Sequence, residues 1–115
     1  MSPYLRTRTI DGCVVVELCG EIDIVAATEI TPLLDALTRP PGPDVIVDLG
    51  RVDFIDCSGL AALCRVRSRV GDYGGQVQFV CDRHPTLKVL RATGLLRAFR
   101  PVPSVSEARA RLGRP

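Results

Sequence analysis

The sequence predicts an α/β fold in which short strands alternate with helices. Apolar runs of strand length are separated by segments with helical period, and the first two runs are joined by Asp11-Gly12, a tight-hairpin signal. Hydrophobic residues make up 46% of the 115 residues but aromatic residues only 4%, so the core must be aliphatic. Alternating strands and helices imply a mostly parallel sheet, and the hairpin gives it an antiparallel start.

Two strands are expected before the first helix. Leu5–Ile10 alternates weakly, and residues 13–19 form a Val-rich run after the Asp11-Gly12 turn. Residues 20–23 are expected to end the second strand, because glycine and two acidic residues interrupt the apolar run.

The first helix is predicted over Ile24–Leu37, with Asp23 as its N-cap. Pro32 falls inside this helix and predicts a kink or a late start, because proline lacks the N–H of a helical residue. The proline-rich residues 39–43 are expected to form a stiff loop before the next strand.

The middle of the chain predicts a buried strand over residues 44–49, a polar loop, and a helix over 59–70 that starts near Ser58. Its apolar side is expected to hold Leu60, Leu63, Cys64, Val66 and Val70.

The last third predicts a strand over 76–81 and a helix over 86–93, opened by Pro85 and stopped by Gly94. Residues 99–102 are expected to form a short edge strand, because Pro101 cannot donate to a sheet. Ser104 and Glu107 form a capping box for a final helix through about residue 112.

Length and composition narrow the class of protein. A chain of this size is expected to be one domain, residues 1–115, and its net charge of +2 does not indicate nucleic-acid binding. No apolar stretch reaches the roughly 20 residues of a membrane span, and the first residues lack a signal-peptide pattern. A cytoplasmic protein is therefore expected, without direct contact with nucleic acid or membrane.

The five cysteines contain no C-x-x-C pair, which argues against a zinc site and a disulfide framework. Most are expected to be small core residues. The sequence shows no phosphate-binding loop, dinucleotide fingerprint or nucleophile elbow, and His84, the only histidine, is expected in a loop or cap. We therefore expect neither an enzyme nor a bound cofactor or metal.

Ser58 has two interpretations. Serine is a favoured N-cap, and it is also a phosphate acceptor whose added charge the dipole of a helix N-terminus would tolerate. A phosphate there would change the surface rather than the fold. Cys57, beside the same helix start, is interpreted either as a packing residue or as a reactive thiol.

The turns at Asp23 and Ser58 each follow a strand, so in an α/β sheet they are expected to share one edge. Ser58, Ala62, Arg65 and Arg69 recur at helical spacing and predict a solvent-exposed stripe within a partner interface.

Three segments resemble the STAS domain of anti-sigma factor antagonists. Residues 18–27, LCGEIDIVAA, are similar to the family's G-E-L-D turn, and 47–49 with 54–60, VDL and FIDCSGL, to its D-L and F-I/M-D-S-S-G-L pattern. Residues 89–99, VLRATGLLRAF, match more weakly. The resemblance implies a small mixed sheet of four to five strands with about four helices packed largely on one side.

The resemblance also implies a function. Family members bind an anti-sigma factor that is a serine kinase of the histidine-kinase-like ATPase type, and so free a sigma factor. Phosphorylation of the antagonist then releases it, and a serine phosphatase resets the cycle. By this resemblance the phosphoacceptor is Ser58, and Cys57 departs from the family's usual Ser or Thr. The partner-binding residues are expected to be Asp23, Asp56, Cys57, Ser58, Gly59, Ala62, Arg65 and Arg69.

Two alternatives remain open from the sequence. One is a STAS scaffold outside any sigma-factor pathway, and the other is a thiol-sensing signalling module that depends on Cys57.

Overall fold

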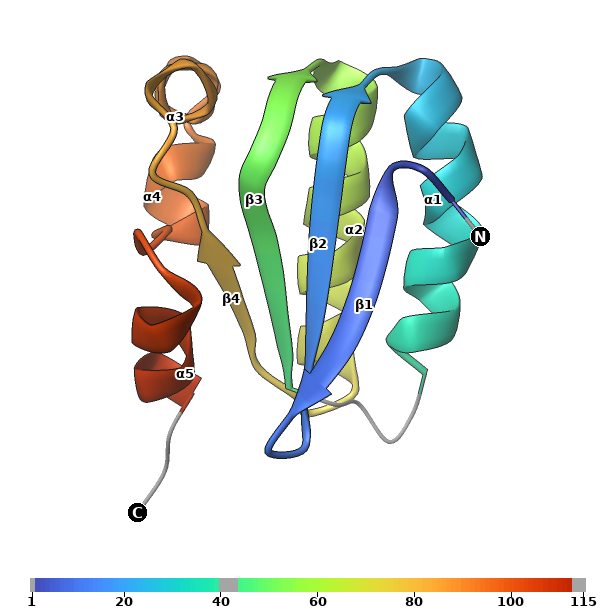
Figure 1. Cartoon of the computed structure of the whole chain (residues 1–115), viewed down its shortest axis with the longest axis vertical. Helices are drawn as coiled ribbons and strands as arrows, with labels where there is room; N and C mark the ends of the chain where they lie inside the picture. Colours follow the sequence, from blue (N-terminus) through green and yellow to red (C-terminus); the bar gives the residue numbers. More distant parts are fainter. Residues whose placement is uncertain (1, 40–43, 113–115) are drawn as a thin grey trace.

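The computed structural model describes residues 2–39 and 44–112, and its centre is one mixed β-sheet with strand order β1-β2-β3-β4 (Figure 1). Its strands are β1 (Leu5–Ile10), β2 (Cys13–Ile22), β3 (Val45–Ile55) and β4 (Val77–Val80). β1 runs antiparallel to β2, whereas β2, β3 and β4 are mutually parallel. The predicted mixed α/β sheet with an antiparallel start is thus confirmed.

The helices lie mostly on one side of the sheet. They are α1 (Ile24–Leu37), α2 (Cys57–Asp72), α3 (His84–Ala92), α4 (Leu95–Phe99) and α5 (Val105–Leu112). α1 and α2 cover one face, while α3, α4 and α5 follow one another along the β4 side (Figure 1). Leu90 of α3 and Phe99 of α4 belong to the same core as α1 and α2, whereas α5 packs against a second cluster on the opposite face.

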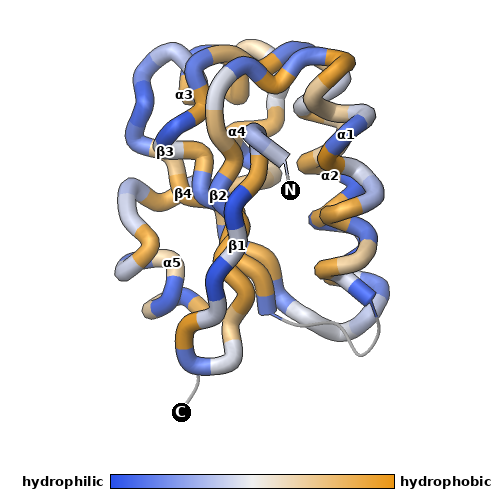
Figure 2. Tube along the Cα trace, turned by 45° about the vertical axis from the view of Figure 1, so that its right-hand side comes forward, coloured by the Kyte–Doolittle hydropathy of each residue, from blue (hydrophilic) through white to orange (hydrophobic). Residues whose placement is uncertain are grey.

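Both faces of the central strands are buried, which explains their continuous apolar sequence. On β2, Val16 and Leu18 enter the larger cluster, while Cys13 and Val15 enter the smaller one beneath α5. Figure 2 shows hydrophobic residues along β2 and β3, in contrast to the hydrophilic residues of the edge strand β1. Burial of aliphatic side chains on two faces therefore holds this sheet together, at about 25 cal/mol per Å² of apolar surface.

The β1–β2 hairpin turns at Asp11 and Gly12, which have φ of 49° and 78°. Two consecutive residues with positive φ match the right-handed twist of the flanking strands, as in a type I′ turn. The Asp-Gly prediction is confirmed.

The strands β2 and β3 are longer than predicted, and the polar loop expected after residue 49 is wrong. β2 continues to Ile22 and β3 to Ile55, with Glu21 paired to Phe54 and Ile22 to Ile55. Register shifts before and after Gly20, which has a φ of 83°, interrupt the alternation of the sequence. Polar residues at these bulged ends therefore looked like loop residues.

The helices follow the sequence closely, with three corrections. α2 begins at Cys57 and not at Gly59, α3 begins at His84, which was expected in a loop or cap, and α4 was not predicted. The expected edge strand 99–102 is only an isolated bridge between Val80 and Val102. α1 begins at Ile24, so Pro32 does not delay its start.

Half of the final capping box is confirmed, because the Glu107 N–H donates to the Ser104 Oγ at 3.1 Å. The Glu107 carboxylate accepts from the Ser104 hydroxyl at 3.5 Å in place of the Ser104 N–H. The expected loop at 40–43 lies outside the described residues.

Candidate functional site

The turns after β2 and β3 meet at one end of the sheet, at the top of Figure 1. The two strands are parallel neighbours, and Ile22 lies opposite Ile55. The Asp56 N–H donates to the Ile22 carbonyl oxygen at 3.3 Å, so the second turn is bonded directly to the end of the first strand. The sheet therefore brings Asp23 and Ser58 to one edge, as the strand-to-helix pattern predicts.

Both turns are capped by aspartate. The Asp23 Oδ1 accepts the Ala26 N–H at 3.0 Å, which confirms Asp23 as the N-cap of α1. The Asp56 Oδ1 accepts the N–H groups of Ser58 at 2.9 Å and Gly59 at 3.2 Å. Asp56 is thus the N-cap of α2, and the interpretation of Ser58 as that cap is wrong.

Gly59 permits the start of α2 to approach the sheet. It is buried, and a Cβ at this position would lie 2.6 Å from the Cγ1 of Ile55. A glycine is therefore needed at this position for steric space and not for an unusual backbone angle. The close approach fixes the first turn of α2 relative to β3.

Ser58 lies one residue into α2, where its side chain is partly exposed. In the part of the chain that the structure describes, its hydroxyl has no hydrogen-bond partner, although its N–H is held by Asp56. The neighbouring Cys57 is exposed. The first turn of α2 thus carries an unengaged hydroxyl and a free thiol on consecutive residues.

Exposed apolar side chains lie at the same end of the sheet as this turn. Ile24 and Val25, in the first turn of α1, are 66% and 65% exposed, and Phe54, near the end of β3, is 50% exposed. The same end carries the carboxylates of Glu21 and Asp53, with Asp53 paired to Arg83 at 3.2 Å. Exposed apolar groups among carboxylates are typical of a protein-binding surface.

Sequence reasoning missed these apolar residues. They precede and follow strand ends, where strand alternation and helical period both fail to say which side faces solvent. The detectable signal was the dipeptide Ile24-Val25 directly after an N-cap, since the apolar stripe of α1 instead follows Ala26, Ile30 and Leu34.

The predicted stripe on α2 does not face solvent throughout. Ala62 is buried at 6% exposure, because α1 packs over it. Arg69 donates to the Thr38 hydroxyl at 3.0 Å and to the Asp35 carbonyl at 3.1 Å. The expected exposure is therefore wrong at Ala62 and at Arg69, which belong to the seam between the two helices.

Arg65 is the exposed member of this seam. Its Nε and Nη2 each donate to the Asp35 carboxylate at 2.8 Å, a two-point contact between α2 and α1. The Arg65 guanidinium lowers the pKa of Asp35 below its usual value, with a smaller contribution from the charge of Arg69. This ion pair links the two helices, and the place of Arg65 in a partner interface stays a prediction.

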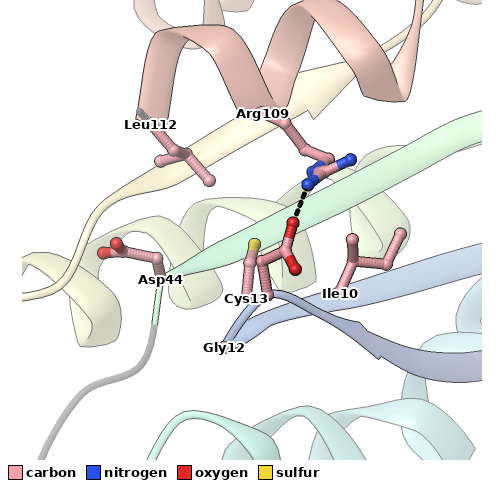
Figure 3. Close-up of a pocket in the computed structure, with 7 residues that line it drawn as sticks. Ile10, Gly12, Cys13, Asp44, Arg109 and Leu112 are labelled. Carbon is pink, nitrogen blue, oxygen red and sulfur yellow. Dashed lines mark hydrogen bonds and ion pairs between the residues drawn. The ribbon is translucent and has the colours of Figure 1, made fainter. Parts of the chain in front are cut away.

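A separate hollow of about 360 Å³ lies at the opposite end of the molecule, between α5 and the β1–β2 turn. In Figure 3, Arg109 points from α5 toward the turn, where it forms an ion pair with Asp11. Asp44 accepts the Gln76 N–H at 2.9 Å, and burial raises the pKa of the Cys13 thiol. The charged groups of this hollow are engaged, so it forms a seam that attaches α5.

The cysteines are all free thiols. Cys13 and Cys81 are buried, Cys19 and Cys64 are partly buried, and Cys57 is exposed, so the expected core role applies to only some of them. Within residues 2–39 and 44–112, no cluster of three or more acidic, histidine or cysteine side chains is arranged to hold a metal ion. None of the described helices has the length and apolar character needed to cross a membrane.

Comparison with known proteins gives relatives in sequence and in structure. The chain is 29% identical over 107 residues to BtrV of Bordetella bronchiseptica, described as an anti-sigma factor antagonist, covering 92% of this chain and 90% of BtrV. An anti-sigma factor antagonist from Mycobacterium paratuberculosis superimposes with a TM-score of 0.85 at 26% identity, covering 96% and 97% of the two chains.

The phosphorylated form of SpoIIAA, a Bacillus cell fate determinant, shares the fold with a TM-score of 0.74 at 20% identity, over 95% of this chain and 99% of SpoIIAA. The STAS domain model matches residues 4–108. The resemblance found in the sequence is confirmed, and the chain belongs to the STAS domain family.

Proposed function

We propose that this STAS domain is an anti-sigma factor antagonist whose binding is switched off by phosphorylation of Ser58. The observation that carries the proposal is the Ser58 hydroxyl, which has no hydrogen-bond partner among the described residues and lies in the first turn of α2, at the end of the sheet that also carries exposed apolar groups. A kinase needs an accessible hydroxyl in a fixed position, and a binding partner needs the apolar surface around it. In this proposal residues 1–115 act as one domain, and the protein is a binding module rather than an enzyme.

The switch would be electrostatic. A phosphate on Ser58 adds about −1.5 to −2 charges at pH 7. The amides of Ser58 and Gly59 already donate to Asp56, so they are not available to hold a phosphate group. The new charge would therefore project from the surface beside the Asp56 carboxylate, and a partner that covers this turn would meet a cluster of negative charge.

The proposed partner is an anti-sigma factor with serine kinase activity, and a serine phosphatase would restore the binding form. The expected location of this exchange is the cytoplasm. SpoIIAA, which has the same fold, exists in a phosphorylated form, and this supports the proposal that such a fold tolerates a phosphate. The surface offered to the kinase consists of Asp23, Asp56, Cys57 and Ser58, with Gly59 as its steric support.

The test is a binding and phosphorylation assay with the kinase that co-purifies with the chain. Ser58→Ala should bind this partner in the presence of ATP and magnesium and remain bound, whereas wild type is released. Ser58→Glu should bind more weakly than wild type before any ATP is added. Ser68→Ala provides a matched control, because Ser68 is exposed on the same helix but far along it. Release of Ser58→Ala by ATP at the wild-type rate would contradict the proposal.

The exposure of Cys57 favours a second candidate, a thiol-sensing signalling module outside a sigma-factor pathway. The two candidates differ in the chemical change found at this turn. Mass spectrometry of the peptide containing both residues, from native cells, should show phosphate on Ser58. Oxidised Cys57 with unmodified Ser58 across growth conditions would favour the thiol sensor.

A further inference from the structure

The outer edge of β1 is open. In the strand order, β1 pairs on one side with β2, and among the described residues no strand lies on its other side (Figure 1). The Cys19 N–H donates to the Tyr4 carbonyl oxygen at 2.8 Å, which makes these two residues a hydrogen-bonded pair. By the alternation of an antiparallel ladder, the N–H and C=O groups of Leu5, Thr7 and Thr9 then point away from β2. The edge therefore offers a row of donors and acceptors to another strand.

One face of this edge is cationic. Arg6 and Arg8 are exposed there, beside a hollow of about 240 Å³ that is also lined by Val15 and Glu17. Arg6 lies opposite Glu17, but the Glu17 carboxylate forms its ion pair with Arg51, at 3.7 Å. Within the described part of the chain, neither Arg6 nor Arg8 makes an ion pair. Both guanidinium groups are available to an acidic partner.

The other face of the edge is apolar. A hollow of about 750 Å³ lies between β1 and α1, with Leu5, Leu33 and Leu37 in its lining. Leu33 is 38% exposed, which is unusual for a leucine in this molecule. Side chains from a strand beside β1 would alternate between this apolar hollow and the two arginines.

An alternative role for exposed arginines on an edge strand is to prevent unwanted pairing with other strands. That role accounts for Arg6 and Arg8 but not for the apolar hollow on the opposite face. A second copy of β1 is also a poor occupant, because an antiparallel pair centred on Thr7 places Arg6 opposite Arg8 of the other copy. Like charges at both ends of the pair would oppose such a dimer.

We infer that the β1 edge is a docking site for an extended segment of a partner protein in which acidic and apolar residues alternate. Backbone hydrogen bonds to Leu5, Thr7 and Thr9 supply affinity, and the two faces of the added strand supply specificity. The acidic residues meet Arg6 and Arg8, while the apolar residues enter the hollow beside Leu33. This site lies on the side of the sheet, away from the turn that holds Ser58, so it is independent of the proposed phosphorylation switch.

A synthetic peptide tests this inference. The probe is a seven-residue peptide with blocked ends and alternating glutamate and valine, labelled for fluorescence anisotropy. We expect saturable binding that weakens at high salt, and about tenfold weaker binding to the double variant Arg6→Glu, Arg8→Glu. The matched control is Arg67→Glu, Arg97→Glu, which reverses two exposed arginines elsewhere and should leave the affinity unchanged. Equal binding of a lysine–valine peptide would overturn the inference.

Thr7→Pro tests the backbone hydrogen bonding of the β1 edge without changing its charges. The Thr7 N–H points outward, so proline removes a donor to the added strand without breaking the β1–β2 ladder. We expect loss of peptide binding with an unchanged melting temperature, and unchanged peptide binding for Ser58→Glu. Wild-type affinity of Thr7→Pro for the peptide would overturn the inference. If the wild-type protein forms a dimer that Thr7→Pro dissociates, the occupant of the edge is a second copy of the chain, and the choice of occupant is wrong. Thr7→Pro tests the β1 edge and Ser58→Glu tests the phosphorylation switch. Failure of this inference is therefore distinguishable from failure of the proposed function.

Discussion

Gly59 and the Ile22 carbonyl are in such close contact that a Cβ on residue 59 would lie 2.7 Å from the carbonyl oxygen. The oxygen belongs to the backbone at the end of β2, and it also accepts the Asp56 N–H. It cannot move away without disturbing the strand and the cap together. Gly59 thus sets the distance between the sheet and the turn that carries Ser58.

Gly59→Ala should destabilise the fold by about 2 kcal/mol, because overpacking at a fixed backbone typically costs 1–3 kcal/mol. The measurement is urea unfolding followed by circular dichroism. Gly71→Ala is the matched control on the same helix, where an added Cβ meets nothing within 4 Å. It should stabilise the protein by about 0.5–1 kcal/mol, since alanine favours helix. Equal effects of the two substitutions would show that the close approach is absent in solution.

Two substitutions distinguish the capping role of the Asp56 side chain from the role of its negative charge. Asp56→Ala should cost about 1–2 kcal/mol of stability, because it leaves two amides of α2 without an acceptor. Asp56→Asn retains an acceptor oxygen and should stay within about 0.5 kcal/mol of wild type. Thermal unfolding of both variants measures the cap, and their affinity for the partner measures the charge. A similar loss of stability in the two variants would mean that the negative charge stabilises α2.

Arg65→Glu should lower the melting temperature by a few degrees, because it sets a carboxylate against Asp35. The swapped pair Arg65→Glu, Asp35→Arg should recover most of that loss, which a surface charge without a partner would not do. Differential scanning calorimetry of the single and double variants gives the coupling. Additive effects would place the two side chains apart in solution.

The same pair predicts a pH dependence. Because Arg65 lowers the pKa of Asp35 in the folded state, the pair stabilises the fold above the ordinary aspartate pKa of about 4. That contribution is lost as the pH falls through the lowered pKa of Asp35. The difference in melting temperature between wild type and Arg65→Gln should therefore be constant from about pH 5 to 8 and shrink below about pH 4. A difference that grows on acidification would contradict this linkage.

Thiol labelling should distinguish Cys57 from the buried cysteines. Cys57 is exposed, whereas burial raises the pKa of Cys13 and Cys81 and slows their reaction. A disulfide reagent at pH 8 should modify one site rapidly in the native protein, and Cys57→Ser should remove this fast phase. The modified protein should also bind its partner less well, because the label lies beside Ser58. Rapid labelling of Cys57→Ser would show that another cysteine is accessible.

Much of this fold follows from local sequence. Asp11-Gly12, the Asp23 cap and the Ser104 cap each depend on residues close in the chain, and each is confirmed. The ends of β2 and β3 were underestimated because their extension depends on pairing between Glu21 and Phe54, residues distant in sequence.

The surface around Ser58 was less predictable for the same reason. The sequence predicted the start of α2 to within two residues. Whether Ala62 faces solvent, however, depends on α1, which packs over it. Asp56 and Ser58 are both good caps, and the extension of β3 to Ile55 decides between them by ending one residue before Asp56. Whether a helix face packs against another helix or faces solvent can be decided only when the neighbouring element is known.

The pairing of Ile22 with Ile55 has a consequence for recognition. Asp23 and Ser58 are neighbours only after β2 and β3 have paired, so the surface is a conformational epitope and not a linear motif. A short peptide that contains Ser58 would lack the first turn of α1 and the acidic cap before it. A partner that contacts both turns at once would therefore bind only folded copies of the chain, and not copies that are unfolded or still being synthesised.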